Sequence, residues 1–129
     1  MSGYLLDTNT ALLALSEPSL LPPSVRKALY RGPNFLSVVS FWEVLLKSVK
    51  GNLKVGDPRM WWLDALEQLA ATPLVVRPEH VAEIYTLPPI HKDPFDRLLI
   101  AQATVEDLGF VTTDHVISGY ASSRFRIIS

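Results

Sequence analysis

The sequence predicts an α/β fold with three layers, in which helices cover both faces of a central, mainly parallel sheet. Short apolar runs that are typical of buried strands alternate with longer helical stretches along the chain. Strands separated by helices form βαβ units, and parallel strands need such crossovers. The chain has 129 residues, 48% of them hydrophobic and 19% charged, which suits one ordinary core. We therefore predict a single domain over residues 1–129.

Strands are predicted where short runs of apolar and β-branched residues lie between turn residues. The first run, Tyr-Leu-Leu, ends at Asp7, and the second follows the turn residues Gly32 and Pro33. Each run is short enough to cross a buried sheet once. The five predicted strands are at 4–7, 35–39, 73–77, 110–114 and 125–128.

Helices are predicted where helical stretches lie between capping residues or prolines. Pro18 stops the first helix, and Ser40 is expected to cap the third as its N-cap. Asp93 precedes the sixth helix as an N-cap followed by a proline, and Gly109 is expected to end that helix. The predicted helices are at 10–17, 23–31, 41–50, 60–70, 79–87 and 94–108, with a short helical turn before the last strand.

Composition narrows the classes of protein to consider. Cysteine is absent, which excludes a disulfide framework and any thiolate metal site. The first residues lack a basic segment and reach Asp7 at once, so we expect a cytoplasmic protein without a membrane span. The formal net charge of -1 gives no overall basic surface, so any contact with nucleic acid must use local patches.

Four acidic residues follow predicted strands or begin predicted helices. Functional groups collect beyond the carboxyl ends of strands in open parallel sheets. Asp7 ends the first strand, Glu43 begins the helix after the second, and Asp114 ends the fourth, so these three should share one edge. Asp96 begins the helix before the fourth strand. Two predicted helices, at 79–87 and 94–108, connect the third strand to the fourth. Asp96 reaches the same edge only if the first of them does not already complete this crossover, and the sequence does not decide between the two cases.

Several of these acids also have a purely structural explanation. Ser40 and Glu43 have the spacing of a capping box. Asp93 matches an N-cap, which places Asp96 in the first helical turn, where a negative charge suits the macrodipole. Asp114 fits an N-cap or a turn residue. Local structure alone would therefore account for these residues individually.

Asp7 is harder to explain locally, because it follows a core strand and is poorly placed for solvent. Carboxylates that crowd together repel one another unless a cation neutralises them. Mg²⁺ and Mn²⁺ prefer oxygen ligands, and Mg²⁺ often binds a few carboxylates together with substrate phosphate. An acidic pocket holding such an ion indicates phosphate chemistry, in which the ion activates a water and orients a phosphodiester.

Four motifs follow one another along the chain. They are Asp7-Thr-Asn-Thr10 after an apolar strand, Ser40-x-x-Glu43 at a helix start, Asp93-Pro-Phe-Asp-Arg-Leu-Leu-Ile-Ala-Gln-Ala103, and Val111-Thr-Thr-Asp114. In order and spacing the chain resembles PIN-domain ribonucleases of the VapC toxin type, from residue 4 to residue 128. The resemblance implies a compact α/β/α domain, Mg²⁺- or Mn²⁺-dependent cleavage of RNA, frequent homodimers and inhibition by a cognate VapB-type antitoxin.

The resemblance also implies which residues form the site. The catalytic and metal-binding acids of the family correspond to Asp7, Glu43, Asp96 and Asp114, which gives Asp96 a place in the acidic cluster. Together they would hold the metal that activates the attacking water. Asp93 is interpreted as the N-cap of its helix, and it could also support the acidic site.

Three further residues are predicted to support the site. Asn9 and Thr112 could hydrogen-bond a metal-bound water or a phosphate, with local turn bonding as an equal alternative. Arg97 is the basic residue that we expect first to contact phosphate. The histidines show no paired ligand spacing and are expected at the surface or in loops; they are His80, His91 and His115.

Three other functions remain open at the level of sequence. A phosphatase of the haloacid dehalogenase type needs a second aspartate two residues after the first, where this chain has Asn9. A receiver-like phospho-acceptor would carry its acid at the third strand, which here ends at Arg77. The third alternative is a PIN-like module that only binds partners, although the presence of all four acids argues against it.

Overall fold

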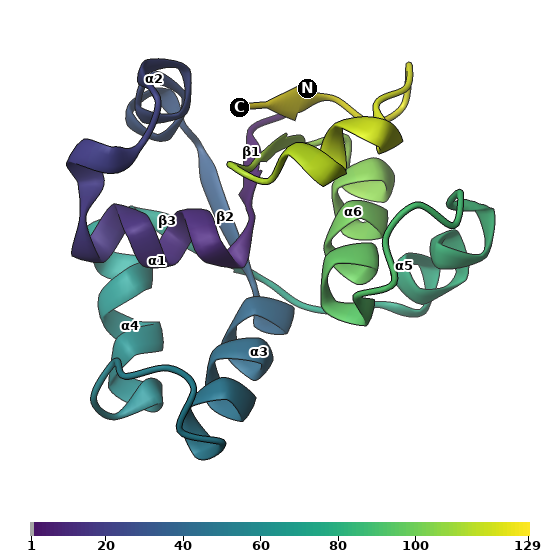
Figure 1. Ribbon diagram of the computed structural model, residues 1–129. Helices are drawn as coiled ribbons and strands as arrows, with labels where there is room; N and C mark the ends of the chain where they lie inside the picture. The colour runs from purple at the N-terminus through teal and green to yellow at the C-terminus, as the bar shows by residue number, and fades with distance from the viewer. Residues whose placement is uncertain (1) are drawn as a thin grey trace.

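The computed structural model describes residues 2–129. Within that range the chain forms a five-stranded sheet with the order β3-β2-β1-β4-β5 (Figure 1). All four strand pairs are parallel. This confirms the predicted parallel sheet. The strands are β1 (Tyr4–Leu6), β2 (Asn34–Ser37), β3 (Ala71–Leu74), β4 (Gly109–Val111) and β5 (Ile127–Ile128).

Helices lie on both sides of this sheet and give the predicted three layers. Figure 1 shows α1, α2 and α4 on one side and α5 and α6 on the other, with α3 beyond the end of β2. The α-helices are α1 (Thr8–Ser16), α2 (Pro23–Arg31), α3 (Val38–Val49), α4 (Pro58–Gln68), α5 (Pro78–Glu83) and α6 (Pro94–Glu106). Three short 3₁₀ helices are η1 (Pro18–Leu20), η2 (Ile84–Thr86) and η3 (His115–Tyr120).

Strand β1 divides the core into two halves. Leu5 and Leu6 are both fully buried, and because successive side chains of a strand point to opposite faces, they enter different clusters. Leu5 packs with Leu99 of α6, whereas Leu6 packs with Trp61 of α4. The central strand is thus covered on both faces, which fixes the position of its carboxyl end.

The start of α3 differs from the prediction. Ser37 is the N-cap, and its Oγ accepts a hydrogen bond of 3.0 Å from the Val39 N–H. Ser40 lies inside the helix, where its Oγ accepts a bond of 2.9 Å from Thr8 Oγ1. The predicted capping box of Ser40 and Glu43 is therefore wrong. The helix begins earlier because Ser37, at the very end of β2, already satisfies the first free amide.

The crossover from β3 to β4 settles the question left open for Asp96. Helix α5 is short and leads through η2 into α6, whose last residue is followed within three positions by Gly109 of β4. Helix α6 therefore makes the return along the sheet, and its first turn lies at the carboxyl edge. Its end also differs from the prediction, because Asp107 is the C-cap in the left-handed conformation and Gly109 already belongs to β4.

No helix in the part of the chain that the structure describes is long and apolar enough to cross a bilayer.

Candidate functional site

The fold brings the four predicted acids to the carboxyl edge of the sheet. Asp7 follows β1, Glu43 lies in α3, Asp96 lies in the first turn of α6, and Asp114 is the N-cap of η3 after β4. The pKa of Asp96 is raised to about 7, first by burial and then by the charges of Asp7, Asp93, Glu43 and Asp114.

Asp7 is the most deeply buried acid of the group, with 3% of its surface exposed. It occupies the N-cap position of α1, yet its side chain makes no capping hydrogen bond. Its Oδ2 instead accepts a bond of 2.7 Å from Thr112 Oγ1. Burial raises the pKa of Asp7, the Thr112 bond lowers it, and the charges of Glu43 and Asp114 raise it again. The carboxylate of Asp7 is therefore held by Thr112 and does not cap its helix.

Glu43 supplies the clearest indication that a cation fits this place. Its Oε2 pairs with Lys47 Nζ at 2.9 Å, one helical turn later. Its Oε1 is buried and has no hydrogen-bond partner among residues 2–129. A buried carboxylate oxygen without a donor is costly unless a ligand completes it. An oxygen-preferring divalent cation held between Glu43 and the neighbouring aspartates would do so.

Lys47 is a further member of this cluster. The hydrogen bond to Glu43 raises the pKa of Lys47 most, and the charges of Asp93 and Asp96 raise it further. The ammonium therefore lies within reach of several carboxylates and offsets part of their repulsion. With 44% of its side chain exposed, Lys47 also borders the solvent.

His91 joins the cluster from the loop before α6, which the sequence did not predict. Its Nε2 lies 3.0 Å from Asp96 Oδ2 and 3.7 Å from Asp114 Oδ2. One ligand atom from each of these three residues lies within 4.8 Å of the others. Spacing rules missed His91 because its contacts are tertiary. The one sequence signal was its place two residues before Asp93.

The supporting residues have more varied surroundings. Asp93 is the N-cap of α6, as predicted, and accepts bonds from the N–H groups of Phe95 at 2.8 Å and Asp96 at 3.3 Å. Thr112 is buried, and besides donating to Asp7 it accepts a bond of 3.0 Å from the Asp114 N–H. Asn9 is exposed on the first turn of α1.

Arg97 has a structural role in the loop between α5 and α6. Its Nη1 donates to the carbonyls of Pro88 at 3.0 Å and His91 at 3.3 Å, and to Tyr120 Oη at 3.3 Å. Its Nη2 donates to the carbonyls of Ile84 and Leu87. This anchoring competes with the phosphate contact expected from the sequence, which stays a prediction.

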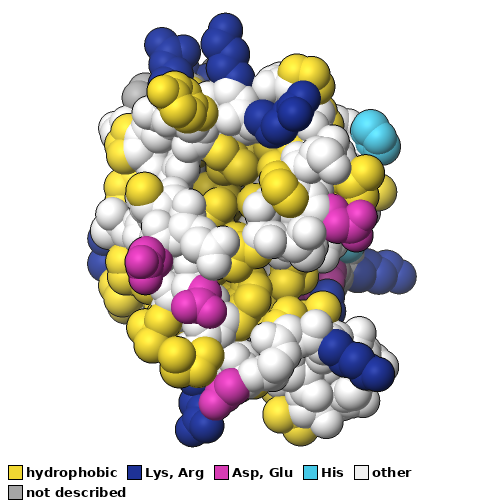
Figure 2. Space-filling model, turned by 90° about the vertical axis from the view of Figure 1, so that its left-hand side faces the viewer, with side chains coloured by type: hydrophobic (Ala, Val, Ile, Leu, Met, Phe, Trp, Pro, Cys, Tyr) yellow, Lys and Arg dark blue, Asp and Glu magenta, His cyan; other side chains and the backbone are white. Residues whose placement is uncertain are grey.

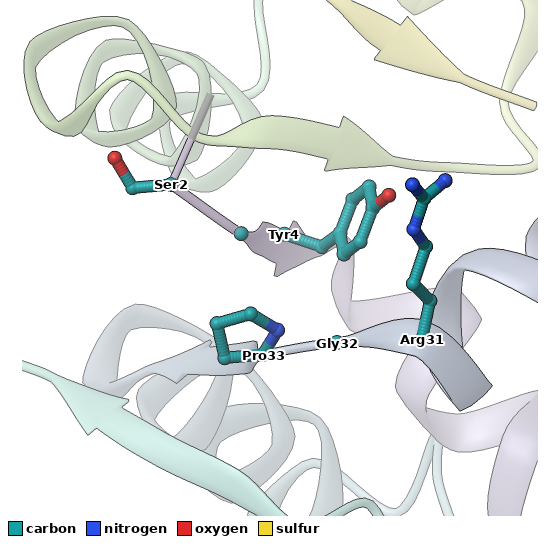
Figure 3. Close-up of a pocket in the computed structure, with 6 residues that line it drawn as sticks. Ser2, Tyr4, Arg31, Gly32 and Pro33 are labelled. Atoms are coloured by element: carbon teal, nitrogen blue, oxygen red, sulfur yellow. The ribbon is translucent and has the colours of Figure 1, made fainter.

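A separate hollow of about 380 Å³ lies at the other end of the sheet, where β1 begins. Figure 3 shows the side chains of Tyr4 and Arg31 next to each other at this hollow, with Pro33 on the same stretch of chain as Arg31. Its lining residues carry no carboxylate or imidazole, so the acidic cluster is the better candidate for metal chemistry. The lining residues are Ser2, Gly3, Tyr4, Arg31, Gly32 and Pro33.

The three layers and the acids beyond the carboxyl ends of β1 and β4 define an α/β/α protein with an acidic site at one edge of its sheet. Residues 4–122 match the model of the PIN domain. The chain belongs to the PIN domain family, which confirms the family predicted from its motifs. No curated protein matches the sequence.

Solved structures show the same fold over nearly the whole chain. A chain in the crystal structure of VapBC2 from Rickettsia felis bound to a DNA fragment from their promoter is 14% identical, with a TM-score of 0.71 and coverage of 96% of both chains. A chain of DNA-bound VapBC from Salmonella typhimurium is 16% identical, with a TM-score of 0.68, and the match covers 98% of this chain and 97% of that one. A chain of VapBC-5 from Mycobacterium tuberculosis, a member of the VapBC family of toxin-antitoxin systems, is 19% identical, with a TM-score of 0.62 and coverage of 99% and 98%.

Proposed function

We propose that this protein is a metal-dependent endoribonuclease and acts as the VapC-type toxin of a toxin-antitoxin pair. The observation that supports this best is the buried, unpartnered Oε1 of Glu43 within a cluster of acids on a PIN domain. The proposal includes one domain over residues 1–129 and a cytoplasmic location, where RNA is available.

The four acids Asp7, Glu43, Asp96 and Asp114 would hold Mg²⁺ or Mn²⁺. When bound, the cation would activate a water and stabilise the charge that develops on a phosphodiester. The chain's own residues prepare this place, since Thr112 fixes Asp7 and Lys47 pairs with Glu43. Fixed carboxylates reduce the reorganisation that cation binding requires.

RNA is the substrate that we propose for this site. The net charge of -1 provides no overall electrostatic attraction to nucleic acid, so we expect recognition by local basic residues. Lys47 lies in the last turn of α3, and Lys50 is the C-cap residue three positions later. Lys92 is exposed in the loop that leads into α6. These three lysines are suitable contacts for phosphates on either side of the scissile bond.

The first experiment is cleavage of a mixed pool of tRNA and rRNA by purified protein freed of antitoxin. Reactions contain Mn²⁺ or Mg²⁺, and parallel reactions contain EDTA or the variant Asp96→Asn. We expect cuts that need the metal and that disappear in both controls. Cuts that survive in EDTA would contradict the metal mechanism. Folded, metal-loaded protein that cuts none of these RNAs would favour the alternative of a PIN module that only binds partners.

We further propose that a cognate VapB-type antitoxin covers an apolar groove between α1 and α4. Figure 2 shows hydrophobic side chains running through the middle of the face that carries these helices. Structural relatives of this chain belong to toxin-antitoxin systems, which supports a partner of this kind. The groove is lined by Leu12, Leu15, Ser16, Leu53, Lys54, Val55 and Trp61.

The variant Leu15→Arg tests this surface, because it places a charge in the groove. We expect the variant to lose co-purification with the antitoxin while its cleavage of RNA persists. Retained binding would place the antitoxin elsewhere. The homodimer predicted from the sequence also belongs to the proposal, and sedimentation of the antitoxin-free protein tests it directly.

A further inference from the structure

We propose that His91 is a positioning residue, which donates a hydrogen bond from its Nε2 to Asp96 and is not itself a ligand of the metal. This rests on the proposed function, since it concerns the same acidic site. Its Nε2 lies 3.0 Å from Asp96 Oδ2, and 23% of its side chain is exposed at the border of the cluster. Two roles are therefore possible by distance alone, and the other ring nitrogen distinguishes them.

The hydrogen bond at Nδ1 fixes the tautomer of His91. Nδ1 accepts a bond of 3.2 Å from the backbone N–H of Asp93. A backbone N–H can only donate, so Nδ1 carries no proton and Nε2 carries it. A histidine that binds a metal through Nε2 normally carries its proton on Nδ1. In that tautomer the N–H at Nδ1 would face the N–H of Asp93, and two donors repel. The geometry therefore favours His91 Nε2 as a hydrogen-bond donor to Asp96.

The backbone of His91 is bonded to both elements that carry the neighbouring acids. The His91 N–H donates a bond of 2.6 Å to Oη of Tyr120, which is buried in η3, the helix that Asp114 caps. The His91 carbonyl accepts a bond of 3.3 Å from Arg97, the residue after Asp96. The ring is thus held in place from α6 and from η3 at once, as a positioning group requires.

Each of the other three acids also accepts a hydrogen bond from one donor of the protein, which indicates the role of His91. One oxygen of each carboxylate is engaged by a donor from the protein: Thr112 for Asp7, Lys47 for Glu43, and the Val116 N–H for Asp114 at 2.9 Å. His91 provides this donor for Asp96. A donor on one oxygen orients the carboxylate, and at Glu43 the second oxygen has no partner among residues 2–129 and would be free to meet a cation.

Binding of Mn²⁺, followed by electron paramagnetic resonance, tests the proposal without any cleavage reaction. The variant His91→Gln keeps an amide N–H close to the position of Nε2, whereas His91→Phe keeps a ring without a donor. We expect Mn²⁺ binding to weaken about tenfold in His91→Phe, as for other residues that orient metal ligands. His91→Gln should restore most of it, and the wild-type spectrum should show no directly bound nitrogen.

Tyr120→Phe provides a second variant, which leaves the imidazole in place and removes one anchor of its loop. It should weaken Mn²⁺ binding by less than His91→Phe. A nitrogen coupling in wild-type protein that is lost in His91→Gln would overturn the proposal and make His91 a ligand. Wild-type affinity in His91→Phe would also overturn it. Wild-type protein that binds no Mn²⁺ would remove the metal site itself, which separates that failure from these two.

Discussion

Thr112 Oγ1 donates a hydrogen bond of 2.7 Å to Asp7 Oδ2 and so joins two residues that are 105 positions apart in the sequence. Both side chains are buried, and they extend from the carboxyl ends of the adjacent strands β1 and β4. The bond lowers the pKa of Asp7, whereas burial raises it. Thr112 therefore favours the ionised carboxylate that a cation needs, in a place where burial alone would disfavour it.

Removing this hydroxyl should impair metal binding through Asp7. In Thr112→Val the pKa of Asp7 should rise further, because the bond that lowers it is lost. The pH at which Mn²⁺ binding is half complete should then move upward, since ligands must be deprotonated to bind. Stability should fall by about 1–3 kcal/mol, because buried partners lose a hydrogen bond. Thr112→Ser keeps the hydroxyl and is the control, and identical pH profiles in all three proteins would contradict the assignment.

Asp7→Asn should abolish RNA cleavage while the fold remains intact. The amide keeps an acceptor for Thr112 but removes the negative charge that the metal requires. Metal-free stability should not fall, because Asn removes a buried charge whose pKa burial raises. Circular dichroism and thermal unfolding in EDTA check the fold, and gel analysis of an RNA pool checks cleavage. Wild-type activity in the folded variant would remove Asp7 from the site.

The sequence predicted the placement of the acids better than the local structure around them. Asp7 and Asp114 could be assigned to one edge because all strands of a parallel sheet run in the same direction. The capping-box spacing at Ser40 gave a wrong helix start, because Ser37 comes earlier in the chain and already serves as the N-cap. His91 was beyond sequence rules, because its partners lie on α6 and η3 and meet it only through tertiary packing.

The raised pKa of Asp96 should make the metal-free protein less stable as the pH rises from about 5 to about 8. Its pKa is raised from 3.8 to about 7 in the folded state. The folded state therefore binds more protons between these values than the unfolded state does. The contribution of Asp96 to the free energy of unfolding is fully present below its unfolded pKa of 3.8 and is lost as the pH rises through about 7.

Asp96→Asn checks this by urea unfolding in EDTA at about pH 5 and about pH 8. Since one pKa unit corresponds to about 1.4 kcal/mol, wild-type protein should lose at least about 1 kcal/mol more than the variant over this range. Added Mn²⁺ should reverse the trend in the wild type, because it stabilises the ionised form. Parallel pH profiles for the two proteins in EDTA would show that Asp96 is not the titrating group.

Asp93→Asn should separate helix capping from metal binding. Asn also caps helices well, so the cost in stability should be about 1 kcal/mol or less, whereas Asp93→Ala should cost about 1 kcal/mol. RNA cleavage should largely persist in Asp93→Asn. The charge of Asp93 also raises the pKa of Asp96, so its removal should lower that pKa. Loss of Mn²⁺ binding in Asp93→Asn, measured by calorimetry, would instead place Asp93 among the metal ligands.

An experiment on Arg97 can separate its role in anchoring the loop before α6 from a contact with phosphate. In Arg97→Gln the loop at 84–91 should open more easily, because the guanidinium bonds to Pro88, His91 and Tyr120 are lost. Hydrogen bonds from charged groups are worth about 1.5–3 kcal/mol, so stability should fall by about that amount. Amide hydrogen exchange should become faster in this loop and remain unchanged in α4. If instead stability and exchange match the wild type while the affinity for RNA falls, Arg97 contacts phosphate as the sequence predicted.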